Sequence, residues 1–353
     1  MSATADHFWR GRRVLLTGHT GFKGGWLAIW LKQLGAEVTG LALPPATEPD
    51  LFTLADVQSG LVHRLCDIRD RGAVAKIVAE ARPELVFHLA AQPLVRAGYA
   101  APVETFETNV MGTVNLLEAS RTSPGLRVVV VATTDKVYRN LERPDPYRED
   151  DALGGHDPYS ASKAAAEIVT ASYRDSFLAA AGVAVATARA GNVIGGGDWS
   201  KDRLLPDAVR SWQAGTTLDV RRPDAIRPWQ HVLEATHAYL RLAEALWTRP
   251  DLASAYNFGP DAAEVASVRT VIDLARATYG AGETRFGAVD PGPHEAGWLS
   301  LEIAKARTVL GIAPRWPLAE AVRRTMAWYR ALHDGANARA LCEADIRAFE
   351  AAA

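Results

Sequence analysis

Val14-Leu15-Leu16-Thr17-Gly18-His19-Thr20-Gly21-Phe22-Lys23-Gly24 joins a short apolar run to a glycine-rich turn, and Trp26-Leu27-Ala28-Ile29-Trp30-Leu31 follows with helical character. The glycines permit a tight turn and a close approach of the backbone, and the first amide groups of a helix are free to bind a pyrophosphate. Such a turn is common by itself, but its place between the first strand and the first helix favours a dinucleotide site. We therefore expect Gly18, Gly21 and Gly24 to bind a cofactor.

Further short apolar runs alternate with helical stretches along the first half of the chain. The apolar runs are 38–43, 61–66, 85–89, 128–131 and 183–189, and the helical stretches are 73–81, 102–121 and 159–178. Almost wholly apolar strands that alternate with helices are typical of a parallel sheet covered on both faces. The sequence thus predicts an α/β fold with a Rossmann-type doubly wound parallel sheet.

The regular alternation loosens past Gly195-Gly196-Gly197. Residues 199–353 mix short strands and prolines with helical stretches around 232–246, 268–277 and 318–332. We expect a smaller mixed α/β substrate-binding lobe over the carboxyl ends of the strands, where such sheets hold ligands. The predicted division is a cofactor-binding Rossmann domain at 1–195 and the lobe at 196–353, with a chain that can cross between them.

Composition restricts the class of protein. The chain has 353 residues, of which 48% are hydrophobic and 23% charged, and its formal net charge is −2. These values are typical of a globular enzyme and give no general attraction to nucleic acid or an acidic membrane. No apolar run approaches the roughly 20 residues of a membrane span. Cys66 and Cys342 have no metal-ligand spacing, so we expect no metal site and a cytoplasmic, reducing location.

Residues that follow the later strands fit the same cofactor site. Asp67-Ile68, Ala90-Ala91-Gln92 and Thr133 follow the third, fourth and fifth apolar runs. A carboxylate at 67 can accept a hydrogen bond from an adenine amino group, although each such residue alone is more often an ordinary loop residue. The second strand ends in Gly40-Leu41-Ala42-Leu43-Pro44-Pro45, which has neither the acid typical of NAD sites nor an arginine for a 2′-phosphate. The sequence favours NAD and leaves NADP open.

Two acid/base devices lie close together in the sequence. Tyr159 and Lys163 are four residues apart, so on a helix they share one face, and the ammonium would lower the pKa of the tyrosine that deprotonates an alcohol. The pair could arise by chance as a core tyrosine and a solvated lysine, but its place behind a nucleotide fingerprint favours catalysis. Thr134-Asp135-Lys136 adds a second pair, which indicates further chemistry on the oxidised intermediate.

The order of these motifs resembles the extended short-chain dehydrogenase/reductase superfamily, and Thr134-Asp135-Lys136 resembles the triplet of the nucleotide-sugar 4,6-dehydratases. Most of those enzymes carry glutamate in the third place, whereas Lys136 is similar to the CDP-glucose 4,6-dehydratases. The stretches that also resemble that family are 19–24, 91–96, 154–159, 190–199 and 227–232. The resemblance runs from about Trp9 to about Tyr329, and the chain departs from it in detail at 133–140 and 141–146.

The resemblance implies a dehydration that proceeds through a 4-ketone. Tyr159 takes the proton of the sugar 4-hydroxyl while hydride passes from C4 to NAD⁺, and Thr134 holds the 4-oxygen. The ketone acidifies the C5 proton, which Lys136 removes as base while Asp135 acts as acid on the C6 hydroxyl. Hydride then returns to C6. A lysine base must be neutral when it acts, which requires burial or a neighbouring cation.

The resemblance also implies sets of binding residues. The cofactor set is Gly18, Gly21, Phe22, Lys23, Gly24, Asp67, Ile68, Leu89, Ala90, Ala91, Gln92, Thr108, Thr133, Tyr159 and Lys163. The substrate set is Gln92, Arg96, Asn192, Arg203, Leu204, Arg222, Arg227 and His231, with Lys201 and Trp229 as further candidates. Asn192 and the arginines would hold the diphosphate of CDP-glucose, since guanidinium forks suit its oxygens. A single arginine is as often a solvated surface residue.

The helices at 102–121 and 159–178 have small and apolar faces, and in related enzymes such helices pair as a four-helix bundle, so we expect a homodimer. Three other readings are another nucleotide-hexose 4,6-dehydratase, a nucleotide-sugar 4-epimerase or decarboxylase, and a non-catalytic NAD-binding regulator. Epimerases and decarboxylases do not need Asp135 and Lys136, and a regulator does not need Tyr159 or Lys163.

Overall fold

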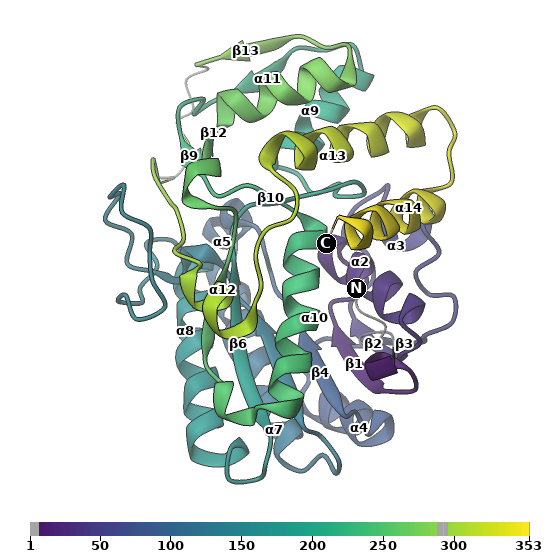
Figure 1. The fold of residues 1–353 in the computed structure, drawn as a ribbon, viewed down its shortest axis with the longest axis vertical. Helices are drawn as coiled ribbons and strands as arrows, with labels where there is room; N and C mark the ends of the chain where they lie inside the picture. The colour runs from purple at the N-terminus through teal and green to yellow at the C-terminus, as the bar shows by residue number, and fades with distance from the viewer. Residues whose placement is uncertain (1–6, 288–291, 293–295, 353) are drawn as a thin grey trace.

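The computed structural model describes residues 7–287, 292 and 296–352, and a seven-stranded parallel sheet forms its centre (Figure 1). The strands are β1 (Arg13–Thr17), β2 (Glu37–Ala42), β3 (Val62–Leu65), β4 (Leu85–His88), β5 (Val128–Ala132), β6 (Ala184–Ala190) and β11 (Ala255–Phe258). Their order across the sheet is β11-β6-β5-β4-β1-β2-β3, and each neighbouring pair is parallel. The predicted Rossmann-type fold is confirmed.

Helices cover both faces of this sheet. They are α2 (Phe22–Gln33), α3 (Leu51–Leu54), α4 (Arg71–Ala81), α5 (Val95–Ala100), α6 (Pro102–Phe106), η1 (Glu107–Met111), α7 (Gly112–Arg121), α8 (Pro158–Tyr173), η3 (Arg174–Leu178) and α10 (Val232–Thr248). Successive strand residues point to opposite faces, so Leu16 and Val130 join the core under α2 and α10 while Leu15 and Val129 join the core under α4 and α7. Because both faces are buried, the strands read as continuous apolar runs.

The smaller lobe lies above the carboxyl ends of the strands, at the top of Figure 1. It contains α9 (Leu204–Gln213), α11 (Val268–Tyr279), α13 (Leu318–His333) and three two-stranded sheets. The short strands are β7 (Val193–Ile194), β8 (Leu218–Val220), β9 (Ile226–Arg227), β10 (Gln230–His231), β12 (Ala266–Ser267) and β13 (Thr284–Phe286). The remaining elements are η2 (Asp135–Val137), η4 (Pro250–Leu252), η5 (Ala262–Glu264), α12 (Ala304–Leu310) and α14 (Ala338–Ala351).

The chain crosses between the two parts more than once. Beyond residue 196 it forms α9 and β8 in the lobe, then returns to the sheet as α10 and β11, and re-enters the lobe at α11. The last helix, α14, packs against α2 and α3 beside the glycine-rich turn. Residue 195 therefore does not separate the sheet from the lobe by itself.

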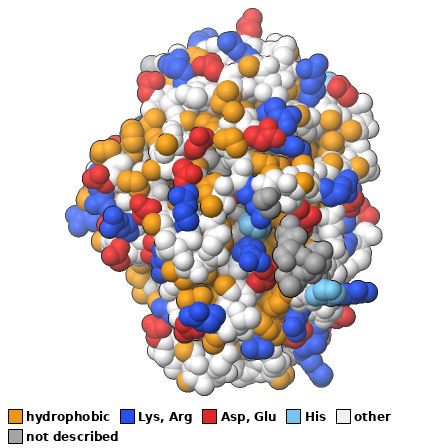
Figure 2. Space-filling view, in the orientation of Figure 1, with side chains coloured by type: hydrophobic (Ala, Val, Ile, Leu, Met, Phe, Trp, Pro, Cys, Tyr) orange, Lys and Arg blue, Asp and Glu red, His pale blue; other side chains and the backbone are white. Residues whose placement is uncertain are grey.

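Acidic and basic side chains are interspersed over the face shown in Figure 2, in keeping with the small net charge of the chain. Among the described residues, no helix combines the length and the apolar character that crossing a membrane requires.

Candidate active site

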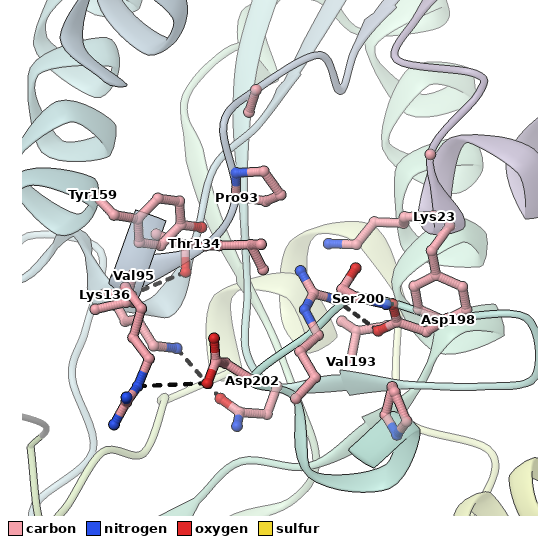
Figure 3. A pocket seen from close by; sticks show the side chains of 18 of the residues that line it. Lys23, Pro93, Val95, Thr134, Lys136, Tyr159, Val193, Asp198, Ser200 and Asp202 are labelled. Carbon is pink, nitrogen blue, oxygen red and sulfur yellow. Dashed lines mark hydrogen bonds and ion pairs between the residues drawn. The ribbon is translucent and has the colours of Figure 1, made fainter. Parts of the chain in front are cut away.

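A cavity of about 770 Å³ opens at the carboxyl ends of the strands, between the sheet and the lobe (Figure 3). The order of the strands reverses between β1 and β4, and residues that follow both strands line this cavity. Open α/β sheets hold their ligands at such a reversal, because the connecting chains diverge there and leave a crevice. The position of the cavity thus follows from the topology.

The glycine-rich turn between β1 and α2 is shaped for close approach. Gly18 has φ +78°, and a Cβ at this position would lie 2.7 Å from the amide nitrogen of Ala90. A Cβ at Gly24 would lie 2.1 Å from the carbonyl oxygen of Gly18, whereas at Gly21 the same distance is 3.4 Å. Gly21 caps α2 without a side-chain hydrogen bond, so the first amides of α2 remain available to an anion. These residues fit the pyrophosphate of a dinucleotide.

Nearly all of the predicted cofactor residues line the cavity. They are Gly18, Gly21, Phe22, Lys23, Gly24, Asp67, Ile68, Leu89, Ala90, Ala91, Thr108, Thr133, Tyr159 and Lys163. Asp67 is already bound to Arg69, with Nη2–Oδ2 at 2.6 Å, and this hydrogen bond lowers the pKa of the carboxyl. An adenine amino group would therefore share the carboxylate with Arg69.

Gln92, predicted for both the cofactor and the substrate, has its side chain bound within the protein. Its amide Nε2 donates to Thr105 Oγ1 at 2.9 Å, and its Oε1 accepts from the backbone amide of Leu94 at 2.6 Å. The backbone amide of Gln92 donates to Asn109 Oδ1, and Asn109 Nδ2 donates to the carbonyl oxygen of Gln92. The side chain therefore ties the loop after β4 to α6, and it does not line the cavity.

The triplet that follows β5 forms one hydrogen-bonded unit. Asp135 is fully buried, and its Oδ1 accepts from Thr134 Oγ1 at 2.9 Å and from Lys136 Nζ at 2.9 Å. Lys136 Nζ also donates to Asn192 Oδ1 at 3.3 Å. Thr134 and Lys136 line the cavity, but Asp135 lies behind them, and its Oδ2 has no partner in the described part of the chain. Asp135 is thus connected to the cavity through Thr134 and Lys136.

The start of α8 places Tyr159 and Lys163 in the same wall. Asp157 caps the helix by accepting from the Ser160 amide at 3.0 Å, and Pro158 occupies the first helical position. Tyr159 is thereby held at the helix entrance beside Thr134 (Figure 3). One turn later, Lys163 donates from Nζ to the carbonyl oxygen of Ala132 at 3.1 Å.

Burial controls the pKa of both Tyr159 and Lys163 in the protein alone. Burial raises the pKa of Tyr159 to about 12, and the hydrogen bond with Thr134 opposes this rise only partly. Burial also lowers the pKa of Lys163 to about 8, against the opposing charge of Glu167. Desolvation disfavours the charged form of each group. The expected lowering of the tyrosine pKa by the ammonium and a nicotinamide ring together stays a prediction.

Two further cations lie close to this wall. Lys23 enters from the first turn of α2, and its pKa falls to about 7 because of burial and the charges of Arg203 and Lys163. Arg203 binds Asp198 with Nη1–Oδ2 at 2.9 Å, and the Asp198 side chain is almost fully buried (Figure 3). Asp198 therefore fixes the guanidinium at the cavity surface. The clustered positive charges make this part of the cavity suited to an anion.

The other predicted substrate residues separate into two groups. Arg96, Asn192, Leu204, Arg222, Arg227 and Trp229 line the cavity. Arg227 also donates to the carbonyl oxygens of Ile226 and Ala296, which fixes its guanidinium against the backbone. Lys201 is exposed and does not line the cavity.

His231, predicted for the substrate, lies in the core. It is fully buried, caps α10 by accepting at Nδ1 from the Leu233 amide at 3.3 Å, and packs edge-on against Trp26 and Trp316. Burial lowers the pKa of His231 to about 3, so the ring is neutral. Its side chain belongs to the core between α2 and the lobe rather than to the cavity.

Sequence reasoning missed three charged groups at the cavity. Asp198 was seen only as part of a longer motif, although a carboxylate after three glycines was a signal. Asp202 Oδ1 lies 3.7 Å from Arg96 Nε and 3.9 Å from Arg221 Nη1, so it connects the sheet side of the cavity to the lobe side. No local pattern marks Asp202 or Arg221. The charges that meet here come from distant parts of the chain, since Arg96 belongs to α5 and Asp202 and Arg221 belong to two different loops.

Comparisons with known proteins agree with this geometry. Residues 14–259 match the model of the NAD dependent epimerase/dehydratase family. The chain is 43% identical over 331 residues to the CDP-glucose 4,6-dehydratase of Salmonella typhimurium, a match that covers 92% of each protein.

Two solved structures share the fold. The UDP-glucose-4-epimerase of Stenotrophomonas maltophila, with bound NAD and formylated UDP-arabinopyranose, has a TM-score of 0.79 at 23% identity and covers 92% of this chain and 100% of its own. The dTDP-glucose 4,6-dehydratase of Bacillus anthracis str. Ames, in complex with NAD, has a TM-score of 0.78 at 20% identity and covers 92% of this chain and 98% of its own.

Proposed function

This chain belongs to the NAD dependent epimerase/dehydratase family, and from that premise we propose that it converts CDP-D-glucose to CDP-4-keto-6-deoxy-D-glucose. The enzyme is a hydro-lyase, and its cofactor is NAD. The observation that carries the proposal is the unit of Thr134, Asp135 and Lys136 in the same cavity wall as Tyr159 and Lys163. The chain therefore holds one acid/base pair for oxidation and a second for loss of water.

The oxidation step uses the wall formed by α8. Tyr159 accepts the proton of the 4-hydroxyl, and Thr134, beside it, holds the 4-oxygen. The high pKa of Tyr159 in the protein alone means that a positive field must stabilise its phenolate during the reaction. Lys163, protonated below its pKa of about 8, contributes to that field. Bound NAD⁺ supplies the site that takes a hydride from C4 and later returns it to C6.

Loss of water uses the Asp135–Lys136 pair as a unit. Along their 2.9 Å hydrogen bond, Lys136 gives a proton to Asp135 and becomes the neutral amine. The amine then removes the C5 proton, which the 4-ketone has made acidic. The pair gives a proton to the departing C6 oxygen, so one water leaves and both side chains return to their starting charges. When hydride adds at C6, the protonated Lys136 returns a proton to C5, which completes the 4-keto-6-deoxy product. Thr134 donates to Asp135 and keeps the carboxyl in place.

The diphosphate of the substrate is assigned to the cationic part of the cavity. Arg203 is fixed by Asp198, and Asn192 is fixed by Lys136, so both present their polar groups without further ordering. Arg96 and Arg222 line the same cavity and add two further cationic side chains around the diphosphate. The preference for CDP-glucose is supported by Lys136 in place of glutamate and by the 43% identity to the enzyme of that name.

We propose a homodimer formed through a four-helix bundle of α6–α7 and α8 from each copy. Large apolar side chains stand exposed on neighbouring turns of these helices: Val103 at 69%, Met111 at 50% and Ile168 at 61%. Ile168→Glu should give a monomer in analytical ultracentrifugation, whereas Val309→Glu, at the exposed Val309 of α12, should not. A wild-type chain that sediments as a monomer would refute the bundle.

We also propose a cytoplasmic location, which is supported by two free cysteines and by a nucleotide-sugar substrate. Fluorescence of a tagged chain in its native cell checks this, and a signal at the envelope would contradict it.

The experiment that tests the function offers CDP-, dTDP-, GDP- and UDP-glucose separately to the enzyme with NAD. Product is followed by the absorbance of the 4-ketone and by mass. We expect loss of one water from CDP-glucose alone. Dehydration of only a dTDP or GDP sugar would show that the enzyme is a 4,6-dehydratase of another nucleotide sugar. A product of unchanged mass with an inverted C4 would show that it is an epimerase.

A further inference from the structure

A buried ion pair lies directly behind the catalytic wall. Glu167 of α8 and Arg189 of β6 are joined by Oε2–Nη2 at 2.9 Å, and their side chains are only 3% and 4% exposed. None of the steps proposed above uses either residue. A buried ion pair is costly unless its remaining hydrogen-bonding groups are satisfied, so its contacts are informative.

The carboxylate of Glu167 is bound by three side chains. Oε1 accepts from Thr133 Oγ1 at 2.5 Å, and Oε2 accepts from Thr187 Oγ1 at 2.7 Å as well as from Arg189. Thr133 comes immediately before Thr134, which begins the catalytic triplet. Glu167 therefore ties the first residue of that segment to α8 and β6.

Arg189 holds the other end of the same segment. Its Nη1 donates to the hydroxyl of Tyr138 at 2.8 Å and to the carbonyl oxygen of Glu149 at 3.0 Å. The Tyr138 hydroxyl donates in turn to Asn257 Oδ1 of β11 at 2.6 Å. Residues 133–138, which carry all three members of the triplet, are thus held at both ends by one buried pair.

Glu167 also lies one helical turn after Lys163, and both side chains are buried. Lys163 faces the ammonium of Lys23 from α2 and the ring of His88 from β4. Among the charges around Lys163, that of Glu167 favours its protonated form, while burial opposes it. The carboxylate therefore has an electrostatic link to the lysine besides its mechanical link to the triplet.

We propose that Glu167 is a positioning residue of the dehydration reaction, which fixes the triplet against α8 and places a buried negative charge one helical turn from Lys163. The inference rests on the proposed function, because it assigns Glu167 a role in the steps of Tyr159 and Lys136. Arg189 balances the charge of Glu167 and binds Tyr138 at the far end of residues 133–138, so the two residues act together.

Three variants separate the effect of side-chain length from the effect of charge. Glu167→Asp keeps the charge, but its side chain is one methylene shorter and does not extend to Thr133. Glu167→Gln keeps the length and removes the charge. Thr187→Val removes one hydrogen bond to Glu167 with almost no change in volume, and it serves as the mild variant if the others do not fold. The matched control is Asp345→Asn, which breaks the Asp345–Arg324 pair (3.0 Å) between α13 and α14.

The measurements are kcat and KM for the sugar nucleotide over pH, with the melting temperature of each holoenzyme. Glu167→Asp should lower kcat by about tenfold at nearly constant KM, because a small displacement of catalytic groups acts on the chemical step. Glu167→Gln should move the alkaline limb of kcat to lower pH by about one unit, since Lys163 loses its proton earlier. Thr187→Val should lower kcat by about threefold. Asp345→Asn should lower the melting temperature only.

A folded Glu167→Gln enzyme with the wild-type alkaline limb, or a folded Glu167→Asp or Thr187→Val enzyme with wild-type kcat, would overturn the positioning role. A wild-type enzyme that turns over none of the sugar nucleotides would instead refute the proposed function. The two failures are therefore distinct.

Discussion

Replacing Lys136 by alanine tests the division of labour between the two acid/base pairs. Lys136 Nζ lies 2.9 Å from Asp135 Oδ1 and 3.3 Å from Asn192 Oδ1, and it is the member of the pair that lines the cavity. Without the amine, the C5 proton has no base, whereas Tyr159, Lys163 and the cofactor turn remain intact. The variant should oxidise the sugar and then stop.

The expected magnitude follows from the role and the contacts. A positioned general base contributes about 10²–10⁴-fold, so the rate of water loss should fall by that factor. Fold stability should fall by about 3 kcal/mol, because the fully buried Asp135 loses its ammonium partner and keeps only its bond from Thr134. The variant is therefore assayed below its own melting temperature.

The assay mixes Lys136→Ala, NAD⁺ and CDP-glucose in a single turnover. The absorbance of the reduced nicotinamide should rise and persist, while mass spectrometry detects little 4-keto-6-deoxy product. Lys201→Ala, at an exposed lysine that does not line the cavity, is the control and should behave as wild type. Full turnover by Lys136→Ala would refute the role of Lys136, and loss of nicotinamide reduction would refute the separation of the two steps.

Three further predictions concern the cofactor turn, the diphosphate and acid stability. Gly24→Ala should weaken NAD binding by about 1–3 kcal/mol in calorimetry, because its Cβ would overlap the Gly18 carbonyl; wild-type affinity in a folded Gly24→Ala protein would contradict the close packing of this turn. Arg203→Lys should raise KM by about tenfold with little effect on kcat, since an ammonium loses the fork but still neutralises Asp198, and an unchanged KM would remove Arg203 from the diphosphate site. His88, His231 and His237 have folded pKa values near 3, lowered by burial from 6.5, so stability should be lost as pH falls from 6.5 toward 3, by about 2 kcal/mol for each histidine at about pH 5. Urea denaturation measures that loss, and a flat profile would show that these rings titrate in the fold near their ordinary pKa of 6.5.

The sheet could be predicted because its signal is local. The run at 128–131 is apolar throughout, and the run at 183–189 is apolar apart from Thr187 and Arg189; they form the central strands β5 and β6. The sequence allows a chain that crosses between the two parts, but it does not locate the crossing strand, because Ala255–Phe258 joins the sheet beside β6 through a pairing that short-range patterns do not encode.

The candidate site could likewise be predicted only where its residues are close in sequence. Tyr159 and Lys163 share a helix, so their spacing places them in one wall, and Gly18 and Gly24 act within one turn. The burial of His231 could not be predicted, because a motif gives a position along the chain but not the direction of a ring.

The electrostatics of the site depend on packing rather than on spacing. Burial from several elements sets the high pKa of Tyr159, and no four-residue pattern reveals it. Glu167 likewise gains its partners from strand β6, which carries Thr187 and Arg189, and from the loop after β5, which carries Thr133.

The central claim is that one sugar loses water while its own hydride moves from C4 to C6. The most direct measurement uses CDP-glucose that carries deuterium at C4, with the product analysed by mass spectrometry and NMR. The account predicts a 4-keto-6-deoxy product with the deuterium at C6. A product with deuterium still at C4, or one whose label has been lost to solvent, would contradict it.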